Sequence, residues 1–448
     1  MGDSRTRLPE VPADWFTQPL MRFLRIESMA GAVLLLSTLV ALALANAAWS
    51  MQFMAMWNIN AGFRLGDIEF SRSLKSWIND GLMTLFFFVL ALELKRELIL
   101  GELRDPRMAA FPLAAAVGGM VAPVGLYLLL IRGGPGAGGW GAVISTDTAF
   151  AMGCLAALGS RISQSLRLFL LSVAIFDDIG AVLVVAIGYG GALNWIAIGF
   201  AGFGLAVVAG IARLGIRSVL IYFAVGAGIW LALDASGIHA TLTGIVLGLM
   251  TPARSWVSDR RLHAILDRVI AYPPREDWSD DGAARRDLRQ AGVAAREAVS
   301  PIERLEFALH PWVAFMILPL FALANAGVSL ASVSFDQTLA ITVFAAFVVG
   351  KPIGIVLFSF LSVTLRLATR PPQLSWGLLA SGSLLTGIGF TMAIFIAELA
   401  FEPHFVDSVK IGVFSASLTS AAAGFLTLAW LTSSREQQLE NTGPSSLE

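Results

Sequence analysis

Two adjacent aspartates, Asp177 and Asp178, interrupt an apolar run from Leu168 to Ile187 that contains no other charged residue. A helix of about 20 apolar residues is long enough to cross a lipid bilayer. A carboxylate near the centre of such a helix costs roughly 2.5–3.5 kcal/mol to insert, and acidic residues in this position usually face a water-filled cavity. The pair therefore predicts a site for a cation and for protons inside a membrane.

The chemistry of such a site is competition for oxygen atoms. Hard cations such as Na⁺ bind oxygen ligands, which carboxylates, the Thr146 hydroxyl group and freed backbone carbonyl groups supply. A carboxylate that is partly desolvated beside another negative charge holds a proton more tightly and can exchange it for a metal ion. If two carboxylates each release a proton for one monovalent ion, the exchange moves net charge across the membrane.

Lys351 is the cation that this chemistry must take into account. It lies in the middle of the apolar segment AFVVGKPIGIVLF, whereas the other Lys and Arg residues fall in loops or near span ends. An unpaired ammonium group inside a membrane is costly, so we expect a carboxylate partner. The candidates are Asp147, Asp177 and Asp178.

The composition is that of a polytopic membrane protein. Of 448 residues, 56% are hydrophobic and 14% are charged, whereas soluble proteins contain about 25% charged residues. The mean hydropathy is +0.73. A net charge of −1 gives no field that would attract nucleic acid. Cys154 is the single cysteine, which excludes an internal disulfide and predicts a small buried residue.

Hydropathy predicts an all-α domain over residues 28–432 with about 12 transmembrane helices, between a cytoplasmic N-terminal segment 1–27 and a cytoplasmic tail 433–448. The apolar run ending near Ala47 is too long for a signal-peptide core, so we interpret it as an uncleaved first span. The expected spans are 28–47, 79–98, 108–131, 140–159, 168–188, 194–212, 217–234, 237–250, 309–328, 339–362, 376–399 and 410–432.

The distribution of basic residues gives the orientation. With the N-terminus inside, the outside segments contain only Arg64, Arg72, Lys75, Arg132 and Lys410. An excess of Lys and Arg in cytoplasmic loops is the strongest sequence indicator of topology. Both termini are therefore expected in the cytoplasm.

Two loops have distinct compositions. The cytoplasmic loop 251–308 is rich in arginine and acidic residues, which predicts partial disorder or a short surface helix. In the outside segment 61–72, polar and apolar residues alternate around Gly66-Asp67, a two-residue turn sequence. This pattern fits a periplasmic β-hairpin or an irregular loop equally well.

The fourth and eleventh spans carry residues that weaken a helix at its centre. The fourth contains Ser145-Thr146-Asp147-Thr148 with flanking glycines, and the eleventh contains Gly387 and Gly389. Paired interrupted spans in two halves of a chain indicate a transporter site. Crossed half-helices leave partial charges at their ends. Asp147 would balance positive N-terminal ends and Lys351 negative C-terminal ends, which is a structural alternative to a direct role in transport.

A short internal repeat accompanies these interruptions. Phe150-Ala151-Met152 and Phe390-Thr391-Met392 are separated by the same interval as Phe111-Pro112 and Lys351-Pro352. The repeat favours two related halves.

Longer segments resemble one family. They are NDGLMTLFFFVLALELKREL from Asn79, STDTAFAMG from Ser145, AIFDDIGAVLVVAI from Ala174, GIHATLTGIVLG from Gly237, LHPWVAFMILPLFALANAGVSL from Leu309, GKPIGI from Gly350 and GIGFTMAIFIA from Gly387. Together they resemble the NhaA family of bacterial Na⁺/H⁺ antiporters. The resemblance covers nearly every expected span.

The resemblance implies inverted repeats with two discontinuous crossed helices, spans 4 and 11. It implies a pH-regulated, electrogenic antiporter of the bacterial inner membrane that exchanges cytoplasmic Na⁺ or Li⁺ for external protons by alternating access. Neither enzymatic activity nor a cofactor is expected. The implied ion site is Asp177, Asp178 and Thr146, with Asp147 and Lys351 at the crossing and Asp80 supporting transport.

The resemblance also implies a pH-response cluster of Glu93, Glu97, Glu306 and His310 at the cytoplasmic mouth, with His239 near the periplasmic side. From the residues alone, Glu93 and Glu97 are equally consistent with an ordinary charged helix end, and His239 with a structural role. Family members form homodimers partly through an extracellular hairpin, which fits residues 61–72. The 251–308 loop is longer than in the shorter family members. Because it sits beside the pH-response cluster, the detailed arrangement of that cluster does not follow from the resemblance.

Two other classes use membrane carboxylates. A cation- or proton-coupled symporter of an organic anion would have only Lys351 to bind its substrate. An intramembrane aspartyl protease also needs two aspartates that share a proton. The sequence lacks the GxGD pattern of such proteases, because Ile175 and Phe176 precede Asp177.

Overall fold

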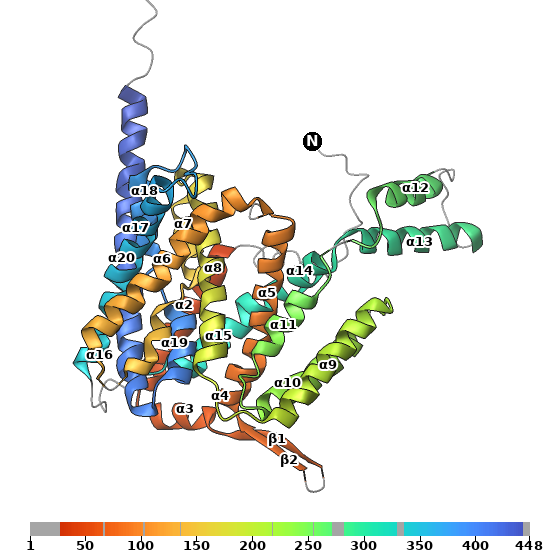
Figure 1. Cartoon of the computed structure of the whole chain (residues 1–448), viewed down its shortest axis with the longest axis horizontal. Coiled ribbons are helices and arrows are strands. Elements are labelled where there is room, and N and C mark those ends of the chain that lie inside the picture. The colour runs from red at the N-terminus through yellow and green to blue at the C-terminus, as the bar shows by residue number, and fades with distance from the viewer. Residues whose placement is uncertain are drawn as a thin grey trace, which may run out of the picture. The chain divides into compact units, whose positions relative to one another are not determined.

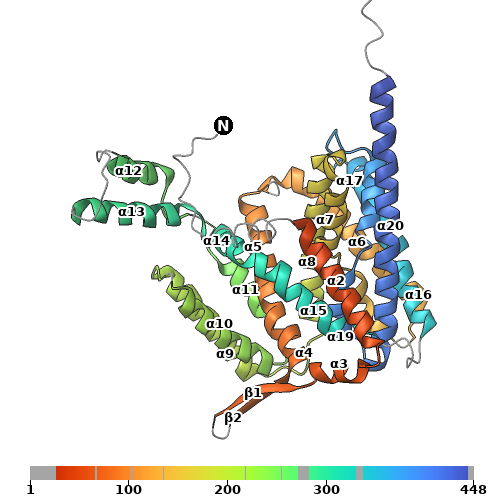
Figure 2. The same ribbon diagram turned by 180° about the vertical axis from the view of Figure 1, so that it is seen from behind.

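The computed structural model describes residues 27–65, 68–101, 104–134, 136–216, 218–253, 255–270, 282–328 and 336–441. The expected segment 1–27 and the end of the C-terminal tail thus lie almost wholly outside the described residues. Apart from one hairpin, the described chain is helical, and its elements are labelled in Figures 1 and 2. It divides into two compact units, residues 1–82, 106–190 and 313–448 in the first and 83–105 and 191–312 in the second.

Within the described ranges, six helices are long and apolar enough to cross a membrane, or up to eight if each bent pair is one span. The six are α6 (Pro106–Ile131), α8 (Gln164–Gly188), α9 (Trp195–Arg213), α14 to α15 (Pro301–Asn325), α16 to α17 (Gln337–Thr364) and α20 (Pro403–Asn441). The other expected spans are helical but shorter or interrupted: α5 (Met83–Ile99), α7 (Thr148–Ala157), α10 (Val219–Ala235) and α11 (Leu242–Met250). Large apolar side chains such as Phe200 and Phe223 are exposed, as lipid-facing residues are.

In the first unit, α6 brings α8 and α17 together. It packs against both helices. A side-chain carbon at Gly118 of α6 would lie 2.2 Å from the carbonyl oxygen of Gly354 in α17, so the two backbones are in direct contact. Small residues allow this close approach in membrane helices. Lys351 begins α17 (Lys351–Thr364) and is thereby held beside α6.

The fourth and eleventh spans are interrupted where the helix-weakening residues lie. The fourth begins as a 3₁₀ helix, η4 (Ala137–Val143), and resumes as α7 after non-helical residues at Ser145, Thr146 and Asp147. The eleventh consists of α18 (Trp376–Leu385) and α19 (Phe390–Ala400), which are bent by 52°. Phe150 and Phe390, which occupy matching positions in the repeat, stack edge to face with ring centroids 5.0 Å apart. The repeated motifs therefore meet where the two spans cross.

The first span ends earlier than expected. Helix α2 (Glu27–Ala45) stops at the Asn46 side chain, which donates to the Leu42 carbonyl oxygen. A second short helix, α3 (Ser50–Trp57), then turns away by 119°. The predicted end at residue 47 was close, but α3 was not predicted.

An antiparallel hairpin follows α3. Strands β1 (Asn60–Leu65) and β2 (Ile68–Ser73) pair from Asn60 opposite Ser73 to Leu65 opposite Ile68. The expected turn residues 66 and 67 lie outside the described residues. The short helices α4 (Leu74–Ser76) and η2 (Trp77–Leu82) come next, and the Trp77 indole nitrogen donates to the Ala61 carbonyl oxygen at 2.8 Å.

In the second unit, α5 packs against α11 and α14 (Pro301–Trp312), and α9 packs against α10. The expected 251–308 loop contains two helices, α12 (Asp259–Ile270) and α13 (Gly282–Ala298). Of the two alternatives for this loop, the helical one applies to these residues, with two helices rather than one. Residues 271–281 between them lie outside the described part of the chain.

Candidate functional site

Asp177 and Lys351 form a fully buried ion pair at the crossing. Both side chains are 0% exposed, and Lys351 Nζ lies 3.1 Å from Asp177 Oδ2. The same carboxylate oxygen accepts a hydrogen bond from the Thr146 hydroxyl group at 2.8 Å. Among the described residues, Asp177 Oδ1 is buried and accepts no hydrogen bond. Of the three candidate partners of Lys351, Asp177 is the one in direct contact.

Lys351 also binds the end of a half-helix. Its ammonium group donates to the carbonyl oxygen of Ile144, the residue that caps the C-terminus of η4. Carbonyl groups at a helix C-terminus carry partial negative charge. The ammonium group therefore balances both a carboxylate and a helix end.

Thr146 joins the two interrupted spans. Its hydroxyl oxygen lies 3.1 Å from the carbonyl oxygen of Thr386, which caps the C-terminus of α18, as well as near Asp177. Thr386 was not among the predicted residues. Its signal in the sequence is its position, because it matches Thr146 across the internal repeat.

Asp147 caps the N-termini of both second half-helices. Its side chain accepts from the Phe150 backbone N–H of α7 at 3.1 Å. It also accepts from the backbone N–H and the hydroxyl group of Thr391 in α19 at 3.0 and 2.6 Å. A carboxylate at a helix N-terminus balances the positive end of the helix dipole. The contacts match the structural alternative for Asp147, and Thr391 is a partner that the sequence analysis did not identify.

Asp178 lies beside Asp177 on α8 but has different surroundings. Its residue is 5% exposed, and its Oδ2 lies 3.4 Å from the Thr148 hydroxyl group at the start of α7. Neighbours on a helix point about 100° apart. One carboxylate therefore faces Lys351 and the other faces α7. The structure thus brings all five predicted core residues, Thr146, Asp147, Asp177, Asp178 and Lys351, to one crossing.

Comparison of the sequence with known families and proteins places the chain in one group. The model of the family described as Na⁺/H⁺ antiporter 1 matches residues 21–428. The chain belongs to this family. It is 70% identical to a protein of Rhizobium meliloti named Na(+)/H(+) antiporter NhaA, over 97% of this chain and 99% of that protein.

More distant relatives cover the chain equally well. A protein of Acidiphilium cryptum named Na(+)/H(+) antiporter NhaA 1 is 53% identical over 97% of this chain and 96% of its own length. A protein of Vibrio vulnificus named Na(+)/H(+) antiporter NhaA 2 is 52% identical over 97% of both chains. The predicted family and the all-α membrane fold are confirmed. These relatives favour neither the symporter nor the protease alternative.

The remaining predicted residues of this antiporter-family chain make contacts of their own within each unit. In the first unit, Asp80 in η2 pairs with Arg72 of β2, with Asp80 Oδ2 and Arg72 Nη1 2.8 Å apart. The pair ties the hairpin to the start of the second span. The expected support of transport by Asp80 stays a prediction.

In the second unit, Arg96 connects three of the predicted acidic positions. It lies 2.5 Å from Glu306 Oε1 on α14 and 3.1 Å from Glu97 Oε1 on α5. Glu93 acts on the same arginine through its charge. Glu306 is the most buried of the group, with its side chain 11% exposed. His310 follows one helical turn later on α14, and its charge acts on Glu306. Arg96, the residue that connects the cluster, was counted in the sequence only as a basic loop residue.

His239 is separate from these residues. It lies in the turn before α11, where its carbonyl oxygen accepts from the Leu242 N–H. Lys95, on the same helix as Glu93 and Glu97, reaches the carbonyl oxygens of Leu249 and Thr251 at the opposite end of α11. His239 and the acidic cluster therefore lie at opposite ends of α11.

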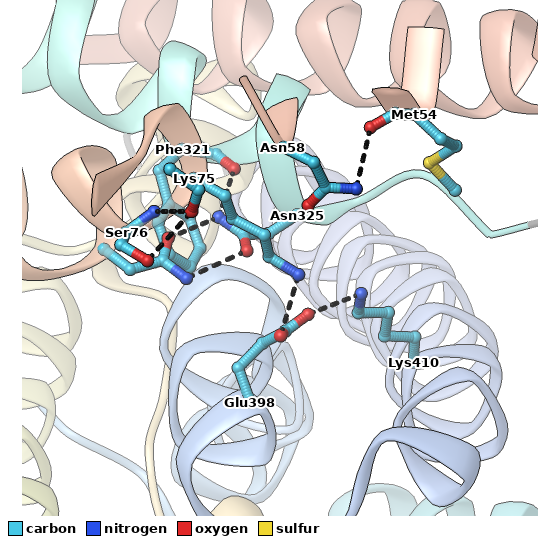
Figure 3. Close-up of polar contacts among 10 residues, drawn as sticks. Met54, Asn58, Lys75, Ser76, Phe321, Asn325, Glu398 and Lys410 are labelled. Carbon is cyan, nitrogen blue, oxygen red and sulfur yellow. Dashed lines mark hydrogen bonds and ion pairs between the residues drawn. The ribbon is translucent and has the colours of Figure 1, made fainter. Parts of the chain in front are cut away.

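A second lysine–carboxylate cluster was not predicted. In the first unit, Glu398 near the end of α19 lies between Lys75 of α4 and Lys410 of α20, at 2.8 Å and 2.7 Å (Figure 3). The neighbouring Asn325 amide exchanges hydrogen bonds with the Asn79 side chain. The available signal was Glu398 itself, the one acidic residue of the eleventh expected span.

Proposed function

We propose that the chain exchanges Na⁺, or Li⁺, for protons across the bacterial inner membrane, with Asp177 and Asp178 as the groups for which the ions compete. One observation carries the proposal. Two adjacent carboxylates, 0% and 5% exposed, lie at the crossing of two interrupted spans in a chain of the Na⁺/H⁺ antiporter 1 family. Carboxylates inside a membrane are costly to insert and usually mark an ion or proton pathway.

The mechanism begins with the oxygen atoms. Asp177 Oδ1, the Asp178 carboxylate, the Thr146 hydroxyl group and the carbonyl groups freed at the helix breaks are candidate ligands for a hard cation. When the cation is absent, one proton occupies the Asp178 carboxylate and a second stays on Lys351, which pairs with Asp177. Arrival of Na⁺ displaces the Asp178 proton directly, because the same oxygen lone pairs cannot hold both.

Lys351 enters the proton count. While Asp177 and Lys351 are paired, the pair already has one positive charge for one negative charge. A cation that binds Asp177 replaces the ammonium group as its counter-charge, so the charged form of Lys351 loses its stabilising partner. The lysine proton can then leave together with that of Asp178. Two protons for one Na⁺ move one net charge, and the exchange responds to the membrane potential.

The crossing allows alternating access. Asp147, Lys351 and Thr146 together hold the ends of four half-helices by hydrogen bonds, so small rotations of these segments change which side the carboxylates face. The ion site itself does not have to move across the membrane.

Three further roles belong to the same proposal. Both termini are cytoplasmic, which follows from the arginine distribution. The cluster of Glu93, Arg96, Glu97 and Glu306 adjusts activity to pH, since it concentrates ionisable groups around one arginine. The β1–β2 hairpin joins two copies of the chain as a homodimer, and shortening it should convert a dimer to a monomer in light-scattering measurements.

The decisive experiment uses proteoliposomes with an imposed pH gradient and a fluorescent reporter of that gradient. Adding NaCl or LiCl without any organic solute should collapse the gradient, and KCl serves as the comparison salt. The same assay between pH 6 and 9 gives the activation profile. A gradient that collapses only when an organic anion is supplied would instead identify a symporter.

A further inference from the structure

The α12–α13 pair has an exposed apolar face that is lined by arginines. Figure 1 shows the two helices side by side, to the right of α11 and α14. They pack against each other, and Ala291 and Ala294 of α13 are buried, at 5% and 3% exposure. A different face of α13 carries Leu288 and Ala295, with Val299 just beyond its end, and all three are exposed. Leu288 and Ala295 are seven positions apart, and Ala295 and Val299 are four apart, which places them on one line along the helix.

Arginines line this exposed stripe. Arg285, Arg289 and Arg296 are exposed and fall on one side of α13, next to the line of Leu288, Ala295 and Val299. The acidic residues of the helix point elsewhere. Glu297 pairs with Arg304 of α14 at 3.2 Å, and Asp287 lies half-buried on the side of Ala291 and Ala294. The exposed face therefore combines apolar area with positive charge.

The chain connections put this face close to the bilayer. Helix α13 ends at Ala298, and the membrane-crossing segment Pro301–Asn325 begins three residues later. At the other end of the insertion, the backbone N–H groups of Trp256 and Val257 both donate to the Glu297 carbonyl oxygen at 3.2 Å. The Trp256 side chain is 63% exposed there. Exposed tryptophans are typical of the membrane–water interface.

We propose that this face of α13 binds anionic phospholipids of the cytoplasmic leaflet. Leu288, Ala295 and Val299 enter the interface, and Arg285, Arg289 and Arg296 bind lipid phosphate groups. Amphipathic helices with this combination of charge and apolar residues lie in the plane of the interface. Each arginine near an anionic surface strengthens binding about fivefold. The ligand is a phospholipid with a net negative headgroup, in the leaflet that the chain itself crosses.

The test uses the full chain in lipid nanodiscs that each hold one copy. A Cys154→Ser, Leu288→Cys variant carries an environment-sensitive fluorophore, and spin-labelled lipids serve as quenchers. In discs containing phosphatidylglycerol, quenching should exceed that in phosphatidylcholine discs by at least about fivefold, the effect of a single arginine. A label at Arg260→Cys, on the side of α12 away from its half-buried apolar residues, should stay in water in both lipids.

Charge variants separate the arginine stripe from general basicity. Arg285→Gln, Arg289→Gln and Arg296→Gln together should reduce the quenching to its level in phosphatidylcholine. The matched triple Arg260→Gln, Arg261→Gln and Arg268→Gln removes the same charge from α12 and should leave it unchanged.

Three results would overturn the proposal. A Leu288 label that is equally exposed to water in both lipids would do so, as would an α12 triple variant that abolishes quenching as completely as the α13 triple. Shielding that occurs only in discs holding two copies, whatever the lipid, would assign the face to a second copy of the chain. The comparison of lipids in the arginine-containing protein remains decisive even if a triple variant fails to fold, and it does not depend on ion transport.

Discussion

Two lysine–carboxylate clusters in the first unit are built from the same groups but differ in how the carboxylate is satisfied. At the crossing, Asp177 has one lysine partner and a hydroxyl group on a single oxygen, and Asp178 lies next to it. Near the end of α19, Glu398 has one lysine on each oxygen. Besides the helix-capping Asp147, the crossing therefore has two carboxylates for one ammonium group, whereas Glu398 lies between two ammonium groups.

This difference distinguishes a site of ion exchange from a contact that holds helices together. A cation entering the crossing finds negative charge that Lys351 alone does not balance, so binding and proton release are coupled there. One carboxylate between two ammonium groups offers a cation no unshared charge, and its value is to connect α4, α19 and α20. Removing charge at the first cluster should stop transport, and removing it at the second should lower stability.

The largest expected effect comes from the carboxylates of the crossing. Asp178→Asn and Asp177→Asn should each reduce Na⁺-driven proton flux to the level of protein-free liposomes, because an amide neither exchanges protons nor attracts a cation. Glu402→Gln is the control, since the Glu402 side chain is 79% exposed. Thermal unfolding should show that both aspartate variants remain folded. Wild-type flux in either variant would show that the substituted residue takes no part in the exchange.

Lys351→Ala should come next, with an effect on stability as large as that on transport. It leaves the Asp177 carboxylate buried without its cation, and breaking a buried ion pair costs roughly 3–5 kcal/mol. The double variant Asp177→Asn, Lys351→Ala should recover part of this loss in free energy of unfolding, since no uncompensated charge remains. A Lys351→Ala protein that is as stable as wild type but electroneutral in transport would show that the lysine counts protons without supporting the fold.

How far the sequence predicts these clusters depends on whether a residue's partners are encoded locally. Asp177, Asp178 and Lys351 stand out because each is a charge inside an apolar span, and the helix breaks follow from glycines and hydroxyl residues. Thr391, Thr386 and the Ile144 carbonyl group are partners only because two distant spans cross, and no local pattern specifies that contact. The short helix α3 was not predicted, and for the 251–308 loop a surface helix was one of two open alternatives.

Glu398→Gln should have a smaller effect, and it should lower stability rather than transport. The amide leaves Lys75 and Lys410 without a shared negative charge, so the free energy of unfolding should fall by about 2 kcal/mol, between the values for exposed and buried pairs. The Na⁺ concentration for half-maximal flux should stay within about twofold of wild type, because transition-state and ground-state binding at the crossing are untouched. A large loss of Na⁺ affinity at unchanged stability would show that this cluster belongs to the ion path.

The smallest effects separate the two lysines that hold Glu398. The Lys410 side chain is 5% exposed and that of Lys75 is 30% exposed, so water replaces the second contact more easily than the first. Lys75→Gln should therefore lower the free energy of unfolding by less than about 1 kcal/mol, as for surface ion pairs. Lys410→Gln should cost more, because Glu398 would then keep only the more hydrated of its two partners. Thermal unfolding of both variants in the same detergent gives the comparison. If Lys75→Gln proved the more damaging, the attachment of the hairpin-bearing α4 segment, rather than burial of charge, would be what Glu398 provides.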